Sequence, residues 1–437
     1  MISVANKQSF AITNLLTTDS RFKKDAARWL KAMREEGATR FSETGFPTPK
    51  DEEWKYTNIS AIADKKFHFP AEQKIIETEE FERYRDKSQI NIVFVNGFFS
   101  KEHSNLASLE KNITFCNLAD MGKEDPTITP FLNKYEAAKE DSFTALNRAF
   151  MHQGAVIKMS DNTIAKKLIH IIHIVSAAKE DVIVFPRTLI ILGKSSEAEV
   201  LESHLAFSGI SYFSDALTDI FLSENAKLKY YKAQGESIRA FHIGTTRVCQ
   251  ERDSQFESFS FSTGALMTRN NLTVALNGEG ASSTLDGLYA VAGEQHVDDH
   301  TAVDHRPPNC KSNQLYKGIL DGNAKAVFNG KIFVRREAQH TNSYQLNKNL
   351  LLGSGCQVNT KPQLEIFADD VRCTHGATIG QLNEDELFYL QSRAIPKSQA
   401  VRILSRGFVD DVFSSISNTF VRAKMDQLLT RVFSILK

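Results

Sequence analysis

A cysteine and a histidine lie two residues apart in the run VRCTHG at 371–376. On a β-strand, residues two positions apart point to the same face, so Cys373 and His375 would lie side by side on one surface. Thiolate and imidazole groups are both competent iron ligands. The alternative is a structural role, because most cysteines are small buried hydrophobic residues. The pair therefore predicts either a metal-binding edge or the packed end of a strand.

Three histidines and three aspartates form the densest group of potential metal ligands, in the run HVDDHTAVDH at 296–305. On a helix, His296 and His300 would chelate one metal. On a strand they would lie about 13 Å apart, because each residue rises by about 3.3 Å. The surrounding sequence is β-rich and prolines follow at 307 and 308. We therefore expect His296, His300 and His305 to be structural residues, hydrogen-bonded within a β turn. A metal-dependent lyase or hydrolase that uses this cluster is the alternative.

Other catalytic motifs are missing from the sequence, which contains no nucleophile elbow, P-loop or dinucleotide-binding fingerprint. The five cysteines are scattered, odd in number and free of any CxxC pair, so neither a disulfide framework nor a zinc ribbon is indicated. Reduced thiols fit the cytosol.

The charge balance excludes some classes of partner. The chain has 437 residues, with 53 Lys+Arg and 53 Asp+Glu, so its net charge is zero. Bulk electrostatics therefore give no reason to expect a nucleic-acid or anionic-membrane partner. No run approaches the ~20 apolar residues that cross a bilayer, and the N-terminal residues lack a signal-peptide pattern. We expect a cytoplasmic protein that is not membrane-embedded, and near-zero charge mildly favours life in a complex.

Short apolar strands separated by Gly, Asn, Ser and Asp must position these residues. They dominate the chain from about 155 to 380. Several runs close on leucine before a small polar turn and a return strand: Leu192, Leu222, Leu276, Leu320 and Leu352. A loose repeat of this kind is typical of a parallel β-helix, with a sandwich as the alternative. We predict a mainly β protein with a β-helix core at 155–380, an N-terminal helical and mixed region at 1–154 and a C-terminal helical domain at 381–437.

The N-terminal region is expected to begin with a helix. Phe22, Ala26, Trp29 and Met33 recur at helical spacing, with Asp19 as a plausible cap. Gly37 is the predicted stop of this helix.

Two further elements are expected before residue 155. A strand at 91–95 runs into an Asn-Gly turn, and a second helix is predicted at 142–152. Between them and the first helix, the segment 45–57 contains Pro47 and Pro49 and is predicted to be a loop. Trp54 and Tyr56 alternate with polar residues and would pin it to a neighbour.

Two amphipathic helices are predicted after the β core. Asn383 is a capping residue, and Pro396 suits the first turn of the next helix. Apolar stripes run along 401–416 and 421–435, with Gly407 expected to interrupt or end the first. The sequence does not decide whether these stripes pack on each other, on the core or on a partner.

The run at 296–305 and the motifs that follow it resemble the SufB/SufD family, scaffold proteins of the SUF iron–sulfur cluster assembly system. The resemblance covers about half of the chain. Its motifs are KGIL at 317–320, VFNG at 327–330, AQHT at 338–341, NLLL at 349–352, KPQLEI at 361–366, DDVRCTHGAT at 369–378, LFYL at 387–390 and SR at 392–393.

Within this family the chain is similar to SufD-type members in two places. One is the Pro-x-x-Lys-x-Glu-x-Trp-Lys-Tyr-Thr pattern at 47–57, and the other is the Cys-x-His-Gly-Ala-Thr form of the last motif. A departure is Ala394, where the family often has glycine.

The resemblance implies a right-handed parallel β-helix that pairs with a SufB-like paralogue and docks a SufC-like ATPase through the C-terminal helices. It implies a non-catalytic role in which a nascent, transient iron–sulfur cluster forms near the interface with the paralogue. His375 is the residue implicated in cluster formation, with Cys373 beside it. A flavin in the complex and a homodimer of the isolated chain are left open. A purely structural adaptor that holds an ATPase without touching iron is the third hypothesis.

Overall fold

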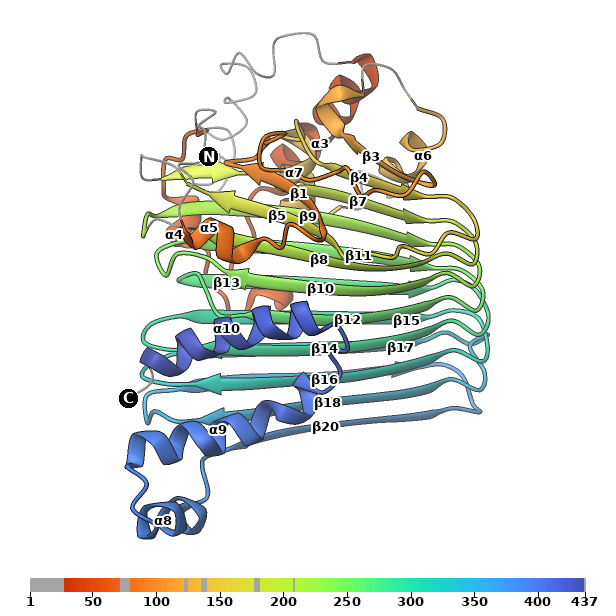
Figure 1. The fold of residues 1–437 in the computed structure, drawn as a ribbon. Coiled ribbons are helices and arrows are strands. Elements are labelled where there is room, and N and C mark those ends of the chain that lie inside the picture. Colours follow the sequence, from red (N-terminus) through yellow and green to blue (C-terminus); the bar gives the residue numbers. More distant parts are fainter. Residues whose placement is uncertain are drawn as a thin grey trace.

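Two parallel β-sheets face each other and form a solenoid, in which the chain crosses to the opposite sheet after every strand from β7 onward (Figure 1). The computed structural model describes residues 27–70, 79–121, 125–134, 140–176, 181–206 and 209–435. The prediction of a mainly β protein with a parallel solenoid core between helical ends is confirmed.

The first sheet, sheet I, carries the candidate Cys373 and His375 on its last strand. Its strands, in spatial order, are β2 (Phe98–Phe99), β1 (Ile90–Val95), β5 (Ile169–Val175), β8 (Glu197–Ala206), β10 (Lys227–Gly235), β12 (Gln255–Ser262), β14 (Ser282–Val291), β16 (Lys311–Leu320), β18 (Asn342–Leu351) and β20 (Arg372–Gly380). All pairings are parallel except that of β1 with the short β2.

The second sheet, sheet II, carries the histidine cluster on β15. Its strands, in spatial order, are β19 (Gln357–Ile366), β17 (Lys325–Val334), β15 (His296–His305), β13 (Met267–Leu276), β11 (Phe241–Gln250), β9 (Tyr212–Leu222), β7 (Arg187–Leu192), β4 (Ala155–Met159) and β3 (Ile113–Asn117), with β6 (Val182–Val184) beside β9. Since β1 joins β5 and β3 joins β4, residues before 155 contribute strands to both sheets.

The core between the two sheets explains the repeated leucines. Leu192, Leu222, Leu276 and Leu320 each end a strand and are at most 1% exposed. Because side chains alternate along a strand, every second residue points into the solenoid, and these leucines fill its corners. The expected strand end near Leu352 falls one residue earlier, where β18 stops.

The helices lie outside the sheets. They are α3 (Arg28–Thr44), η1 (Glu52–Trp54), α4 (Ser60–Ala63), α5 (Glu79–Tyr84), η2 (Leu118–Asp120), α6 (Thr129–Leu132), α7 (Ser142–Ala149), α8 (Glu384–Ser392), α9 (Lys397–Phe413) and α10 (Thr419–Ile435). Among the described residues, none of them combines the length and apolar composition that crossing a bilayer requires.

Helices α3 and α7 pack on sheet II at the end of the solenoid where the chain enters it, whereas α5 packs on sheet I through Phe81. Phe41 of α3 and Phe143 of α7 join a buried cluster with Phe213 of β9 and Ile243 of β11. The predicted second helix is present but stops at Ala149.

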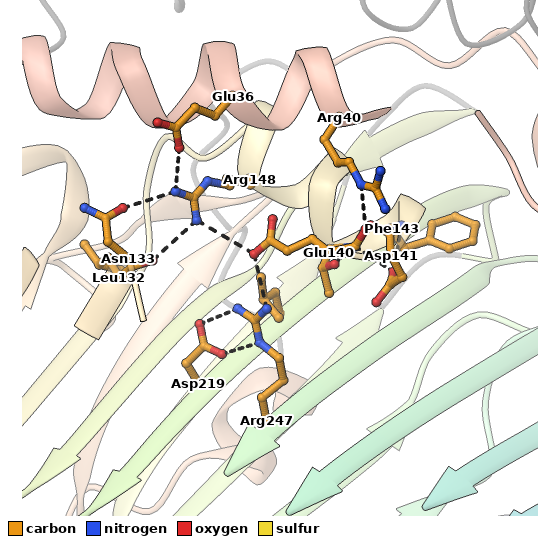
Figure 2. Close-up of polar contacts among 12 residues, drawn as sticks. Glu36, Arg40, Leu132, Asn133, Glu140, Asp141, Phe143, Arg148, Asp219 and Arg247 are labelled. Carbon is orange, nitrogen blue, oxygen red and sulfur yellow. Dashed lines mark hydrogen bonds and ion pairs between the residues drawn. The ribbon is translucent and has the colours of Figure 1, made fainter. Parts of the chain in front are cut away.

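Buried charges fix these helices to the sheet (Figure 2). Arg247 of β11 donates to Asp219 of β9 at 2.6 Å and to Glu140 at 3.2 Å. Arg148 of α7 lies 3.7 Å from Glu140 and 3.0 Å from Glu36 of α3. Burial would raise the pKa of Asp219, but its arginine partners outweigh burial and hold it below the ordinary value. The network thus links α3, α7 and two strands of the solenoid.

The first helix differs from the prediction at its C-terminal end. Asp19, Phe22 and Ala26 lie outside the described residues. Gly37 was the predicted stop but lies within α3, which continues to Thr44. The reason is a close helix crossing: a side chain at Gly37 would meet the backbone of α7, with its Cβ 2.6 Å from the Ala149 nitrogen.

Helices α9 and α10 lie across the outer face of sheet I, whereas α8 lies beyond its last strand, β20 (Figure 1). Val412 of α9 and Val421, Met425 and Leu428 of α10 pack on strand residues such as Phe259. Lys317 of β16 adds an ion pair with Asp411, at 2.5 Å. The question left open by the sequence is therefore answered, because both stripes pack on the solenoid itself.

Two details of these helices also differ from the prediction. Gly407 neither interrupts nor ends α9, which runs through it to Phe413. Space explains the tolerance, since nothing lies within 4 Å of a Cβ built there. Pro396 is the N-cap residue of α9 rather than part of its first turn. Asn383 caps α8 as predicted, accepting hydrogen bonds from the backbone of Asp385 and Glu386.

Candidate functional site at the open end of the solenoid

Cys373 and His375 lie on β20, the last strand of sheet I. In the parallel register Cys373 pairs with Ser343 of β18, and His375 pairs with Gln345. Ser343 and Gln345 are buried inside the solenoid, so Cys373 and His375 share the inward-facing side of their strand. The structure thus brings the two predicted site residues onto one face.

The environment of Cys373 is apolar. Its side chain is half-buried against a small cluster that contains Ile332, Val334, Ala338 and Ala368. Burial raises the pKa of the Cys373 thiol. A raised pKa favours the protonated thiol over the thiolate, which is the form that binds metals and attacks electrophiles. In this chain by itself, Cys373 is a poorly activated ligand.

His375 has the opposite setting, because it is exposed. Gly376 follows it and packs closely on the neighbouring strand, where an added Cβ would lie 3.1 Å from the side chain of Leu346. The imidazole is therefore presented at the end of the solenoid with little bulk beside it, and it is available to a ligand or a second chain.

The two last strands form a terminal rung that is uncovered. No residue of β19 or β20 is fully buried, whereas β17 and β18 of the preceding rung each contain several buried residues. Each of these strands is also the edge of its sheet. The rung exposes large apolar side chains, including Phe367 at 59% and Ile379 at 48%. An unpaired edge with exposed apolar residues is a template for pairing with another chain. We call this surface the open end.

The histidine cluster has a different role from the open end. It occupies the whole of strand β15, rather than a turn as expected. His300 lies 2.9 Å from Asp298 through one ring nitrogen, and its other ring nitrogen lies 3.1 Å from Arg269 and 3.3 Å from Glu53. His296 lies 2.9 Å from the hydroxyl of Thr57. The three histidines are therefore not gathered on one centre.

The third histidine of this group, His305, is fully buried. His305 makes a 2.9 Å hydrogen bond with Ser312, and burial lowers its pKa to about 4. Among the described residues, no group of three His, Cys, Asp or Glu side chains is arranged to hold a metal ion. This geometry agrees with the structural reading of His296, His300 and His305.

A strap formed by residues 47–57 crosses the outer face of sheet II, and the histidine cluster holds it there. Trp54 packs on Phe143, and the guanidinium of Arg269 lies 4.1 Å from its ring. Glu53 pairs with Lys331 of β17. The hydrogen bond with His300 lowers the pKa of Glu53 to about 2, even though partial burial opposes the shift. The sequence did not predict a role for Glu53, because its partners lie more than 200 residues away in the chain.

One of the two aromatic residues predicted to pin the strap to the sheet does not do so. Tyr56 was predicted to pin the segment but is 45% exposed. Glu52 pairs instead with Lys361 of β19, so the strap reaches the terminal rung.

Large apolar side chains are exposed on α8. Phe388 and Tyr389 are 72% and 58% exposed, and α8 has no fully buried residue. Ala394, which follows α8, has a positive φ of 66°, the conformation that favours glycine. Such a conformation would suit the glycine that the resemblance implies at this position.

Comparison with known proteins agrees with this geometry. Residues 173–408 match the SUF system FeS cluster assembly SufBD core domain, and residues 9–171 match the SufBD protein N-terminal region. A SufBD family iron–sulfur cluster assembly protein of Synechocystis is 34% identical over 401 residues, 88% of this chain and 87% of that protein. The chain belongs to the SufB/SufD family.

Two further relatives come from other organisms. The iron–sulfur cluster assembly protein SufD of Escherichia coli is 28% identical over 396 residues, which is 89% of each chain. A chloroplastic protein of Arabidopsis thaliana is 29% identical over 401 residues, 90% of this chain and 84% of that protein.

Proposed function

We propose that this protein is a non-catalytic, SufD-type scaffold subunit of a SUF iron–sulfur cluster assembly complex. It pairs with a SufB-like subunit through the open end and contributes to iron acquisition and to formation of the nascent cluster there. The observation that carries the proposal is the open end itself, with exposed His375 on an edge strand. Two unpaired edges fit a second parallel solenoid continuing both sheets across the interface.

His375 is the stronger ligand and Cys373 the weaker. A neutral imidazole binds iron without losing a proton, whereas the Cys373 thiol, whose pKa is raised by burial, must first ionise. A transient cluster needs ligands that release it, and a single exposed histidine shared between two subunits meets that need. We expect iron and the cluster to be cargo of the complex rather than resident groups of this chain.

The test compares three complexes, each co-expressed with the cognate SufB-like and SufC-like subunits. His375→Ala should leave the complex assembled but without the visible absorbance and iron of a cluster. Cys373→Ser should lower cluster content less. His340→Ala is the matched control, because His340 is an exposed histidine in the turn between β17 and β18 that pairs with Asp370. Full cluster content in the His375→Ala complex would refute the assignment.

The ATPase-docking element is proposed to be α8 and the outward side of α9. The apolar stripes of α9 and α10 are buried on sheet I, so they are not free to bind a partner. The exposed apolar residues are Phe388, Tyr389 and Ile403.

The position of these residues decides which variant can test ATPase docking. Truncation after Gly380 would uncover the face of sheet I that α9 and α10 bury, so loss of binding could reflect misfolding. The double change Phe388→Ala and Tyr389→Ala should abolish pull-down of the ATPase while leaving the unfolding temperature unchanged. Undiminished pull-down would place docking elsewhere. Ile238→Ala, at a 65% exposed position in a turn of the solenoid, is the control.

The proposal also covers the cellular location, the cofactors and the self-association of this protein. All five cysteines are free, which fits the reducing cytoplasm that we propose for this chain. A flavin, if the assembled complex binds one, would be detected by its absorbance in the co-expressed complex. A homodimer is the expected state of the isolated chain if the open end pairs with a second copy, and mixing with the SufB-like subunit should dissolve it. No described arrangement of ligands favours the metal-dependent lyase or hydrolase.

A further inference from the structure

The two free edges of the open end are not equivalent as templates for a partner strand. In a parallel strand, the backbone N–H groups of successive residues point alternately to the two neighbouring strands. Arg372 of β20 donates to Thr341, just before β18, at 2.8 Å. The groups that point to the free edge of β20 are therefore the N–H groups of Cys373, His375, Ala377 and Ile379. None of these residues is proline, so β20 offers an unbroken row of donors.

The free edge of β19 is interrupted at its middle. At the start of the strand, Gln357 donates to Ala324, which precedes β17, at 3.1 Å. Just after its end, Phe367 donates to Val334 of β17 at 2.9 Å. Odd-numbered residues thus face β17, and even-numbered residues face the free edge. Pro362 belongs to the second set and has no N–H to donate. A partner strand can therefore form a continuous ladder with β20 but not with β19.

The strap lies beside this interruption. Lys361, which precedes the proline, pairs with Glu52 of the strap. That hydrogen bond raises the pKa of Lys361, and the phenol of Tyr56 raises it further, so Tyr56 lies near the same part of β19. The strap thus adds side chains to the open end at the point where β19 lacks a backbone donor.

We propose that the strap is part of the interface with the SufB-like subunit, with Tyr56 as its anchor, and that β20 supplies the continuous backbone ladder. Trp54, the other aromatic residue of the strap, packs on Phe143, whereas Tyr56 is 45% exposed. Tyrosine is enriched at the energetic centres of interfaces, because it buries a large ring and keeps a polar hydroxyl. The ion pairs of the strap with β17 and β19 hold it in place before the partner binds, which lowers the ordering cost of association. The role of the strap rests on the proposed function for the identity of the partner.

The first test measures how tightly the full chain pairs with the cognate SufB-like subunit, by isothermal titration calorimetry. Tyr56→Ala should weaken pairing about tenfold, the loss expected for an aromatic anchor at an interface. Its unfolding temperature should change little, because the side chain is exposed in the isolated chain. Ile238→Ala is the control, because Ile238 is 65% exposed in a turn of the solenoid away from the open end. It should pair with the affinity of the unchanged protein.

The second test compares the two edges with matched proline substitutions. Ala377→Pro removes a free-edge donor from β20, and Thr360→Pro removes one from β19, which Pro362 already interrupts. Neither change removes a hydrogen bond within the chain, because both N–H groups point away from the neighbouring strand. Ala377→Pro should abolish pairing, whereas Thr360→Pro should weaken it far less. An equal loss in both variants would overturn the difference between the edges, and the first test does not depend on either proline variant folding.

A third variant separates the strap from the open end itself. Ile379→Lys, at a 48% exposed position of β20, should prevent pairing whatever the strap does. If Ile379→Lys prevents pairing but Tyr56→Ala pairs with unchanged affinity, the strap has no part in the interface and the proposed function stands. If both variants pair normally, the interface lies elsewhere, and the proposed pairing through the open end fails as well. If Tyr56→Ala changes only the self-association of the isolated chain, measured by sedimentation, the strap contacts a second copy, which would also overturn the proposal.

Discussion

The two ends of the solenoid are built in opposite ways. At the N-terminal end every residue of β1 is buried, the sheets close on the short antiparallel strands β2 and β3, and helices pack against the first rungs. At the C-terminal end, β19 and β20 contain no fully buried residue and have free edges. Natural β-proteins protect edge strands by shortening or covering them. This difference supports the proposal that the open end pairs with a partner.

The largest expected effect comes from breaking the covered end. Asp219→Ala removes the carboxylate shared by Arg187 and Arg247, all of them buried. Removing the carboxylate between two buried arginines should lower the free energy of unfolding by about 3–5 kcal/mol, measured by urea denaturation. Glu197→Ala is the control, because its ion pair with Lys227 is close to half exposed and should cost less than about 1 kcal/mol.

The same variant has an expected pH dependence. The folded-state pKa of Asp219 lies below its ordinary value of 3.8, since the arginines outweigh burial. Its contribution to stability is therefore complete above the unfolded pKa and is lost as pH falls through the folded pKa. The difference between the unchanged protein and Asp219→Ala should shrink in acid. A constant difference down to strongly acidic pH would contradict this reading.

Two helix glycines should change stability by smaller amounts and in opposite directions. Gly37→Ala would drive a methyl group into the backbone of α7, so we expect a loss of about 1–3 kcal/mol. Gly407→Ala meets nothing within 4 Å in α9 and should stabilise by up to about 1 kcal/mol. Thermal unfolding of the two variants should therefore shift in opposite directions, and shifts of the same sign would show that the α3–α7 crossing is not as close as described.

The strap between the two ends gives a smaller effect. His300→Ala removes contacts with Asp298, Arg269 and Glu53. We expect a loss of about 1–2 kcal/mol in stability, with easier proteolysis near residue 53. Stoichiometric zinc in the purified protein, lost in this variant while the fold stays intact, would reverse the structural interpretation of the cluster.

The smallest expected effect on stability is at the open end. Ile379 is 48% exposed, so Ile379→Lys should change stability by no more than about 0.5 kcal/mol. It should nevertheless prevent pairing with the SufB-like subunit, because a charge would be buried at the interface. Size-exclusion chromatography of the mixed subunits measures this. Ile238→Lys, far from the open end, should pair normally, and equal pairing by both variants would place the interface elsewhere.

The sequence by itself determined the local features of this protein. Alternation and turn residues predict strands such as the one at 91–95, and Asn383 predicts the start of α8, because both depend on contacts within a few residues. The i, i+2 spacing of Cys373 and His375 likewise implies a shared face wherever the strand lies. The motifs that resemble the SufB/SufD family identify the solenoid and the family, which the comparisons confirm.

The tertiary structure decided what depends on distant neighbours. Gly37 continues a helix because α7 lies against it, and Gly407 does so because its face of α9 is open. The stripes of α9 and α10 are buried on sheet I, which no helical periodicity could reveal. The exposure of His375 follows from β20 being the last strand of its sheet. Burial and edge position are properties of the assembled sheet, so they arise only when strands far apart in sequence pair.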